Sequence, residues 1–138
     1  MNPLLHYQID SRAAAPAYRQ LMAQVAYYVA SGALVPGAQL PSIRALARYL
    51  GVNPSTVVKA YAELEVDQVV ESRQGSGVFV RAGAKVPTVR QRQAALRERA
   101  RTLVVEASQM GADRELVLRI VAEELAALEH GIEPRNES

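Results

Sequence analysis

Residues 40–65 read LPSIRALARYLGVNPSTVVKAYAELE and predict two short helices separated by a tight turn. Ser42 is placed to cap the first helix, which ends at Gly51, and Asn53 is placed to cap the second, with Pro54 as its first residue. The apolar residues of each half recur at the spacing of one helix face: Ile43, Leu46, Ala47 and Leu50, then Val57, Ala60, Tyr61 and Leu64. This stretch therefore predicts a helix-turn-helix unit.

The residues on either side extend this unit into a larger fold. Upstream, Pro16 suits the first turn of another helix, which is expected to end at Gly32. Downstream, two β-rich runs, residues 69–73 and 77–81, flank a glycine-containing tip and predict a hairpin. Three helices followed by a two-stranded hairpin is the order of a winged helix-turn-helix domain. The predicted fold is therefore mainly α with a small β-hairpin, and this domain is expected over residues 1–82.

The start of the helix after Asn53 has the composition of a surface that approaches DNA. Ser55 and Thr56 are short and hydroxylated, and Lys59 adds a cation one turn further on. Short side chains allow close approach to base edges, and the helix dipole favours phosphate at this end. The alternative is that Ser55 and Thr56 are ordinary first-turn residues and Lys59 is a solvated surface charge.

Two other elements point toward the same partner. Arg44 and Arg48 lie four residues apart on the exposed side of the preceding helix, where a helix that crosses the DNA backbone meets phosphates. Gly75 and Gly77 allow a tight tip that lies in a minor groove or along a phosphate backbone. Each feature has an equally ordinary structural interpretation, so the case for double-stranded DNA depends on their combination.

Three segments resemble the DNA-binding domain of GntR-family transcription regulators. They are PAYRQL at residues 16–21, the stretch 40–65 quoted above, and GSGVFV at residues 75–80. The resemblance implies a winged helix-turn-helix dimer that binds a palindromic operator. The DNA-contacting positions that it implies in this sequence are Arg44, Asn53, Ser55, Thr56, Lys59, Gly75, Ser76 and Gly77.

The sequence departs from the family pattern at three positions. Some branches of the family carry arginine where this chain has Pro54 and Val58, so the base contacts of those branches are not transferred. The family usually has glycine where this chain has Gln68. Either Gln68 adopts the left-handed conformation, at a cost of roughly 1 kcal/mol, or the helix ends differently here.

Residues 83–138 are predicted to form a linker and a tail of two antiparallel helices. Thr88 is placed to cap a helix that runs to Met110, and a second helix is expected from Arg114 to His130, ended by Gly131. Apolar residues repeat at nearly seven-residue spacing, which suits packing against another helix. The residues expected to mediate dimerisation are Leu96, Leu103, Met110, Leu118, Val121, Leu125 and Leu128.

A second copy of the chain is the expected partner for this tail. A two-helix hairpin cannot bury both apolar stripes on itself, and two-fold operators match two-fold protein symmetry. The alternative is a monomer whose tail packs on its own winged-helix domain. A tail this short resembles the compact YtrA subfamily rather than the branches with a large metabolite-binding domain. A small-molecule effector in a pocket between two subunits stays an open alternative, although no polar cluster marks such a pocket.

Composition excludes several other classes of function. The 138 residues contain no cysteine and only two histidines, so neither a thiol nucleophile nor a metal site is expected. No nucleotide loop or catalytic constellation is found, so we expect no enzyme and no cofactor. The sequence shows no membrane span or secretory signal, which predicts a cytoplasmic protein. The alternative function is a winged-helix module for protein contact, which requires an apolar outer face on the helix that begins after Asn53.

The charge pattern is more informative than the net charge of +2. Residues 85–101 contain six basic residues and one acid, whereas residues 106–138 contain three arginines and eight acids. Two interpretations of the basic run stay open. It extends the surface that faces DNA, or it meets the acidic last helix of the same or the other subunit.

Overall fold

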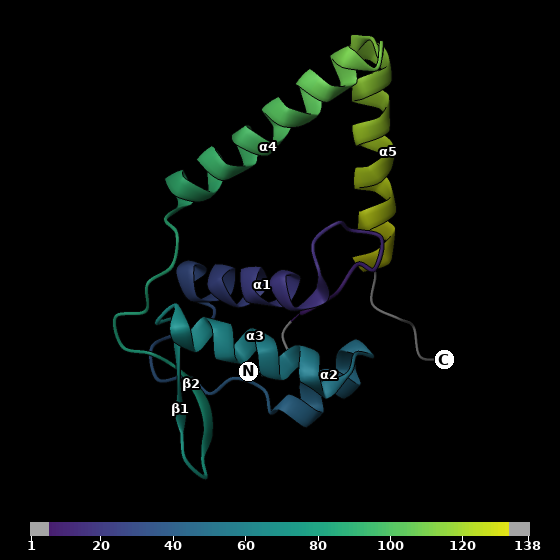
Figure 1. Ribbon diagram of the computed structural model, residues 1–138. Coiled ribbons are helices and arrows are strands. Elements are labelled where there is room, and N and C mark those ends of the chain that lie inside the picture. Colours follow the sequence, from purple (N-terminus) through teal and green to yellow (C-terminus); the bar gives the residue numbers. More distant parts are fainter. Residues whose placement is uncertain (1–5, 133–138) are drawn as a thin grey trace. The chain divides into compact units, whose positions relative to one another are not determined.

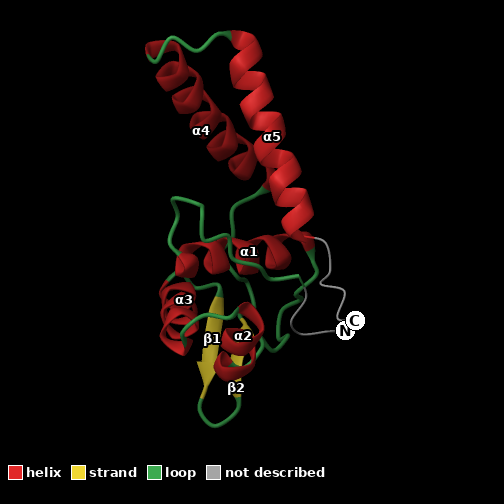
Figure 2. Ribbon diagram, turned by 90° about the vertical axis from the view of Figure 1, so that its right-hand side faces the viewer, coloured by secondary structure: helices red, strands yellow, loops and turns green. Residues whose placement is uncertain are grey.

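The computed structural model describes residues 6–132, which form five helices and a two-stranded antiparallel sheet (Figures 1 and 2). The elements in chain order are α1 (Ala17–Ser31), α2 (Ile43–Leu50), α3 (Pro54–Val66), β1 (Val70–Arg73), β2 (Gly77–Val80), α4 (Val89–Gln109) and α5 (Arg114–Ile132). The chain divides into two compact units between Val89 and Arg90. The predicted fold class, mainly α with one hairpin, is confirmed.

The helix-turn-helix forms where the capping residues predicted it. Ser42 Oγ accepts a hydrogen bond from the backbone N–H of Ala45 at 3.1 Å, and Asn53 Oδ1 accepts one from Ser55 at 2.9 Å. Gly51 ends α2 in the left-handed conformation with φ 68°. Helices α1, α2 and α3 pack around one core, whose fully buried side chains are Leu21, Val25, Leu46, Val57, Leu64, Val70 and Val80.

The strands β1 and β2 pair in a four-residue register from Val70 opposite Val80 to Arg73 opposite Gly77. The segment before α2 adds hydrogen bonds along the free edge of β2. Leu40 N–H donates to the Val78 carbonyl and Val80 N–H donates to the Ala38 carbonyl, each at 2.8 Å. Strand β2 is therefore hydrogen-bonded on both edges, which ties the hairpin to the segment before α2.

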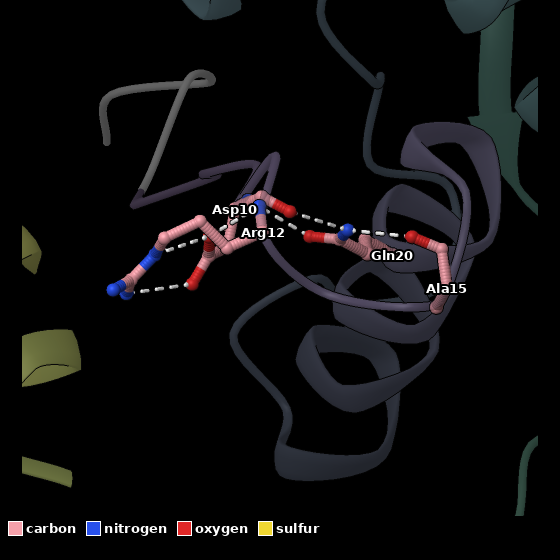
Figure 3. Close-up of polar contacts among 4 residues, drawn as sticks. All are labelled: Asp10, Arg12, Ala15 and Gln20. Carbon is pink, nitrogen blue, oxygen red and sulfur yellow. Dashed lines mark hydrogen bonds and ion pairs between the residues drawn. The ribbon is translucent and has the colours of Figure 1, made fainter. Parts of the chain in front are cut away.

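Two glutamines of α1 attach the segment before this helix. Gln24 bonds the backbone N–H and carbonyl of Gln8, at 2.8 and 2.6 Å. Gln20 bonds both backbone groups of Asp10 at 2.9 Å and also donates to the Ala15 carbonyl (Figure 3). A hydrogen bond from the Arg12 side chain, with one from its backbone N–H, lowers the pKa of the Asp10 carboxyl. These contacts place Tyr7 in the core.

A buried hydroxyl joins α3 to the turn before α2. Tyr61 Oη donates to the Pro41 carbonyl at 2.7 Å, and both residues are buried. Burial, with a smaller contribution from Tyr7, raises the pKa of the Tyr61 hydroxyl, so the group stays protonated and able to donate. The Tyr7 hydroxyl is also buried but has no hydrogen-bond partner within the described residues.

These two tyrosines form a matched test of that hydrogen bond. Tyr61→Phe leaves the Pro41 carbonyl buried and unsatisfied, so we expect the free energy of unfolding to fall by about 1–3 kcal/mol. Tyr7→Phe removes a hydroxyl without a partner and should leave this free energy unchanged or raised. Urea unfolding followed by circular dichroism measures both, and equal losses in the two variants would contradict the assignment.

Helix α3 ends at a left-handed glutamine. Gln68 has φ 63°, which makes it the one non-glycine residue with positive φ in the described part of the chain. Its N–H donates to the Glu65 carbonyl, and the N–H of Val69 donates back to the Leu64 carbonyl. This is the Schellman pattern, in which the left-handed position favours glycine. The expectation that Gln68 adopts the left-handed conformation is therefore confirmed, and the alternative of a different helix end is not.

Gln68→Gly should stabilise the winged-helix domain. Glycine removes the steric cost of the left-handed conformation but adds freedom to the unfolded chain, so the expected net gain is about 0.5 kcal/mol or slightly more. Gln68→Ala keeps the steric cost and should give no gain. Chemical denaturation of the three chains measures the difference, and a loss of stability in Gln68→Gly would show that the Gln68 side chain contributes more than its strain.

The tail helices form an open hairpin. Asp113 Oδ1 accepts a hydrogen bond from Leu116 N–H at 2.9 Å and caps α5, and α4 ends at Gln109. From their connection the two helices separate instead of packing along their lengths (Figure 1). Ala107 is the one buried residue among the described side chains of the tail.

The prediction that Gly131 ends α5 is wrong, because the helix continues through it to Ile132. A glycine weakens a helix but does not by itself stop one.

Candidate nucleic-acid interface

The first turn of α3 presents a polar surface to solvent. Asn53 and Ser55 are exposed and Thr56 is half-buried. The Asn53 side-chain oxygen is occupied by the cap, which leaves its amide NH₂ as a donor toward a ligand. Because Val57 anchors the same turn in the core, the polar side chains are held on a rigid element.

Lys59 is not a freely solvated cation. Its Nζ lies 4.2 Å from the centroid of the Tyr18 ring, in a cation–π contact between α3 and α1. The sequence analysis missed this partner, since Tyr18 lies on a different helix and no local pattern links the two residues. The ring restricts where the ammonium group lies while leaving it exposed.

Helix α2 contributes two exposed arginines. Arg44 and Arg48 form no ion pair within the described residues, and residues 42–62 contain no acidic side chain. The turn of residues 51–53 places the beginning of α3 next to the end of α2. The other end of α3 carries Glu63, Glu65 and Asp67, so the end of the domain with Asn53 favours an anion and the opposite end does not.

The tip of the hairpin is held by a residue that the sequence analysis missed. Gln39 Nε2 donates to the Ser76 carbonyl at 2.9 Å. Gly77 has φ 121°, and a Cβ there would lie 2.7 Å from the same Gln39 nitrogen. The tip between the strands stays exposed, and its residues are Gln74, Gly75 and Ser76. At its base, Arg73 lies over Phe79 and pairs with Glu71 at 3.1 Å.

The predicted site residues separate into the two units of the chain. All eight predicted DNA-contacting positions lie in the winged-helix unit, and all are exposed except the half-buried Thr56. All seven apolar residues predicted for dimerisation lie in the tail unit and are exposed. Within the described residues no cluster of metal-binding side chains is found, and no helix is long and apolar enough to cross a membrane.

Together, three helices, a hairpin with an exposed tip and a basic, hydroxyl-bearing helix start define a winged helix-turn-helix DNA-binding protein. The family described as bacterial regulatory proteins, gntR family, matches residues 17–80. The HTH-type transcriptional repressor YtrA of Bacillus subtilis is 35% identical over 108 residues, which cover 78% of this chain and 83% of that protein. The chain belongs to the GntR family, as its motifs predicted, and is a DNA-binding transcription regulator rather than an enzyme.

Solved structures are similar over most of the chain. YtrA from Sulfolobus acidocaldarius, a GntR-family transcription factor, is 34% identical with a TM-score of 0.52, over 73% of this chain and 95% of that one. A transcriptional antiterminator from Listeria monocytogenes is 28% identical with a TM-score of 0.56, over 86% and 88% of the two chains. Both matches extend beyond the winged-helix unit into the tail.

Proposed function

We propose that the chain is a homodimeric repressor that binds an inverted-repeat operator. The observation that carries this proposal is the exposed apolar surface of α4 and α5, joined to a domain whose basic, hydroxyl-bearing end is free. Leu103 and Leu125 are 47% and 54% exposed in the single chain. Apolar side chains in such a repeat are stable in water only when another helix covers them.

The exposure of the winged-helix residues supports the contacts with DNA that the family resemblance implies. The start of α3 enters the major groove, where Asn53, Ser55 and Thr56 face base edges and nearby phosphates. Lys59 and Arg44 contact phosphates on the two sides of the groove, and Gly75, Ser76 and Gly77 of the hairpin tip follow the adjacent backbone. The two domains of a dimer would place two such surfaces on one side of the duplex.

Repression is proposed from the relatives. YtrA of Bacillus subtilis is named a transcriptional repressor, and its similarity to this chain covers 108 residues, more than the winged-helix unit alone. A dimer that occupies an operator blocks access to the promoter without requiring a further domain. A reporter gene placed behind the selected operator should therefore be less active when the chain is present.

Selection of bound sequences from a random pool of duplex DNA tests the operator. We expect enrichment of an inverted repeat whose half-site centres lie about 10 bp, or a multiple of this distance, apart. Enrichment of a single half-site would contradict the dimer, and no enrichment would contradict sequence-specific binding. Activation of the reporter by the chain would contradict repression.

The role of Lys59 gives a prediction about salt dependence. Each phosphate neutralised contributes about 0.9 to the slope of log affinity against log salt concentration, so Lys59→Ala should flatten this slope by about one unit per half-site. Lys85→Ala is the matched control, because the Lys85 N–H bonds the Gln68 carbonyl at the opposite end of α3. Titrations by fluorescence anisotropy at several salt concentrations measure both. An unchanged slope in Lys59→Ala would exclude a phosphate contact.

A further inference from the structure

The tail carries opposite charges beside its two apolar stripes. The α4 seam consists of Val89, Leu96, Ala100, Leu103, Ala107 and Met110, and the α5 seam consists of Leu118, Val121, Leu125 and Leu128. Arg97 follows Leu96 and Arg99 precedes Ala100, so helical geometry places one arginine on each side of the α4 seam. Glu124 precedes Leu125 and Glu129 follows Leu128, which places one glutamate on each side of the α5 seam.

These four charged side chains are exposed and unpaired in the single chain. Arg97, Arg99, Glu124 and Glu129 form no ion pair within the described residues. The ion pairs that the tail does form, Arg101 with Glu98 and Arg119 with Glu123, each lie within one helix. The two arginines lie at the middle of α4, and the two glutamates lie in the second half of α5.

The winged-helix unit ends beside the C-terminal end of α3. Arg81 N–H donates to the Val69 carbonyl and Lys85 N–H donates to the Gln68 carbonyl, so the chain leaves the winged-helix unit beside the C-terminal end of α3. The DNA-facing residues lie at the N-terminal end of α3, roughly 20 Å away for a helix of 13 residues.

We infer that Arg97 and Arg99 of α4 pair with Glu124 and Glu129 of α5 in a second copy of this chain, across seams packed antiparallel. This inference rests on the proposed homodimer and specifies its interface. Charges beside an apolar seam set the partner and the orientation of packed helices more than they set its stability. A C2 dimer would contain this charged pairing twice, once for each α4.

Two full-length chains with opposite charge changes test the inference. One carries Arg97→Glu and Arg99→Glu, and the other carries Glu124→Arg and Glu129→Arg. Each homodimer would then face like charges at both pairings, so each chain alone should dimerise at least about tenfold more weakly. In a heterodimer of the two variants, one pairing places the new glutamates of α4 opposite the new arginines of α5. The other pairing keeps the wild-type arginines and glutamates. Heterodimers should therefore exceed about nine tenths of all dimers in native mass spectrometry, against about one half by chance.

A control pair makes one charge reversal of the same kind in each chain, away from the seams. Arg101→Glu and Glu123→Arg alter side chains that lie on the outer faces of α4 and α5, and their mixture should stay near the chance proportion. If the wild-type chain is dimeric but the seam variants show no preference, or fail to recover a dimer on mixing, the inference is overturned. If the wild-type chain is monomeric at every concentration measured, the proposed homodimer fails, and this inference fails with it.

Discussion

Replacing Leu103 and Leu125 together by glutamine should convert the chain to monomers at micromolar concentration and weaken operator binding by at least about 100-fold. When one domain of a dimer binds its half-site, it holds the second domain close to the other half-site. This raises the affinity of the dimer for the operator by about 10²–10⁴, and the gain is lost when the dimer dissociates. Both leucines are exposed in the single chain and glutamine is a good helix former, so the fold should survive the change. Sedimentation velocity and operator titration measure the two effects.

The control for this variant is Val105→Gln. Val105 is 48% exposed, as much as Leu103, but lies on the opposite side of α4 from the α4 seam. It should leave both the dimer and operator binding unchanged. A double variant that stays dimeric would remove the tail from the dimer interface, whereas a Val105 variant that dissociates would show that a different face of α4 is covered.

Ser55→Asp should abolish operator binding while leaving the domain at least as stable. Ser55 is exposed in the first turn of α3, where a carboxylate interacts favourably with the helix dipole. Against a duplex, the same carboxylate would face phosphates and the acceptor groups of bases. Juxtaposed like charges cost several kcal/mol, so affinity should fall by at least about 100-fold.

Ala62→Glu is the matched control for Ser55→Asp. It adds the same charge to an exposed position of α3, about 10 Å further along the helix. Its effect on operator affinity should be less than about tenfold, because salt screens most of a charge at this distance. Urea unfolding confirms that both variants are folded. Comparable losses of affinity in the two variants would show that net charge, not the start of α3, governs binding.

The helix-turn-helix could be predicted from sequence because its signals are local. Ser42 and Asn53 cap helices through N–H groups two or three residues away, and Gly51 ends α2 through its own backbone conformation. Local signals also have limits. Gly131 satisfies the same rule for a helix end, yet α5 continues through it.

The residues that orient the proposed DNA surface could not be predicted in this way. Lys59 lies over Tyr18, 41 positions earlier in the chain, and the hairpin tip is tied to Gln39, 37 positions earlier. Tyr61 reaches back 20 positions to Pro41. None of these pairs follows from helical or strand periodicity, because each exists only after α1, α2 and the hairpin have packed on α3.

The sequence by itself determined the order of the elements, the caps of α2 and α3, the two charged halves of the tail and the family. These properties depend on residues within about one helical turn of each other, or on motifs with fixed spacing. Only the tertiary structure decided which side chains hold the DNA-facing residues in place and that the two tail helices leave their seams uncovered. The physical reason is that contacts between distant residues arise from packing, which brings together groups that no local rule pairs.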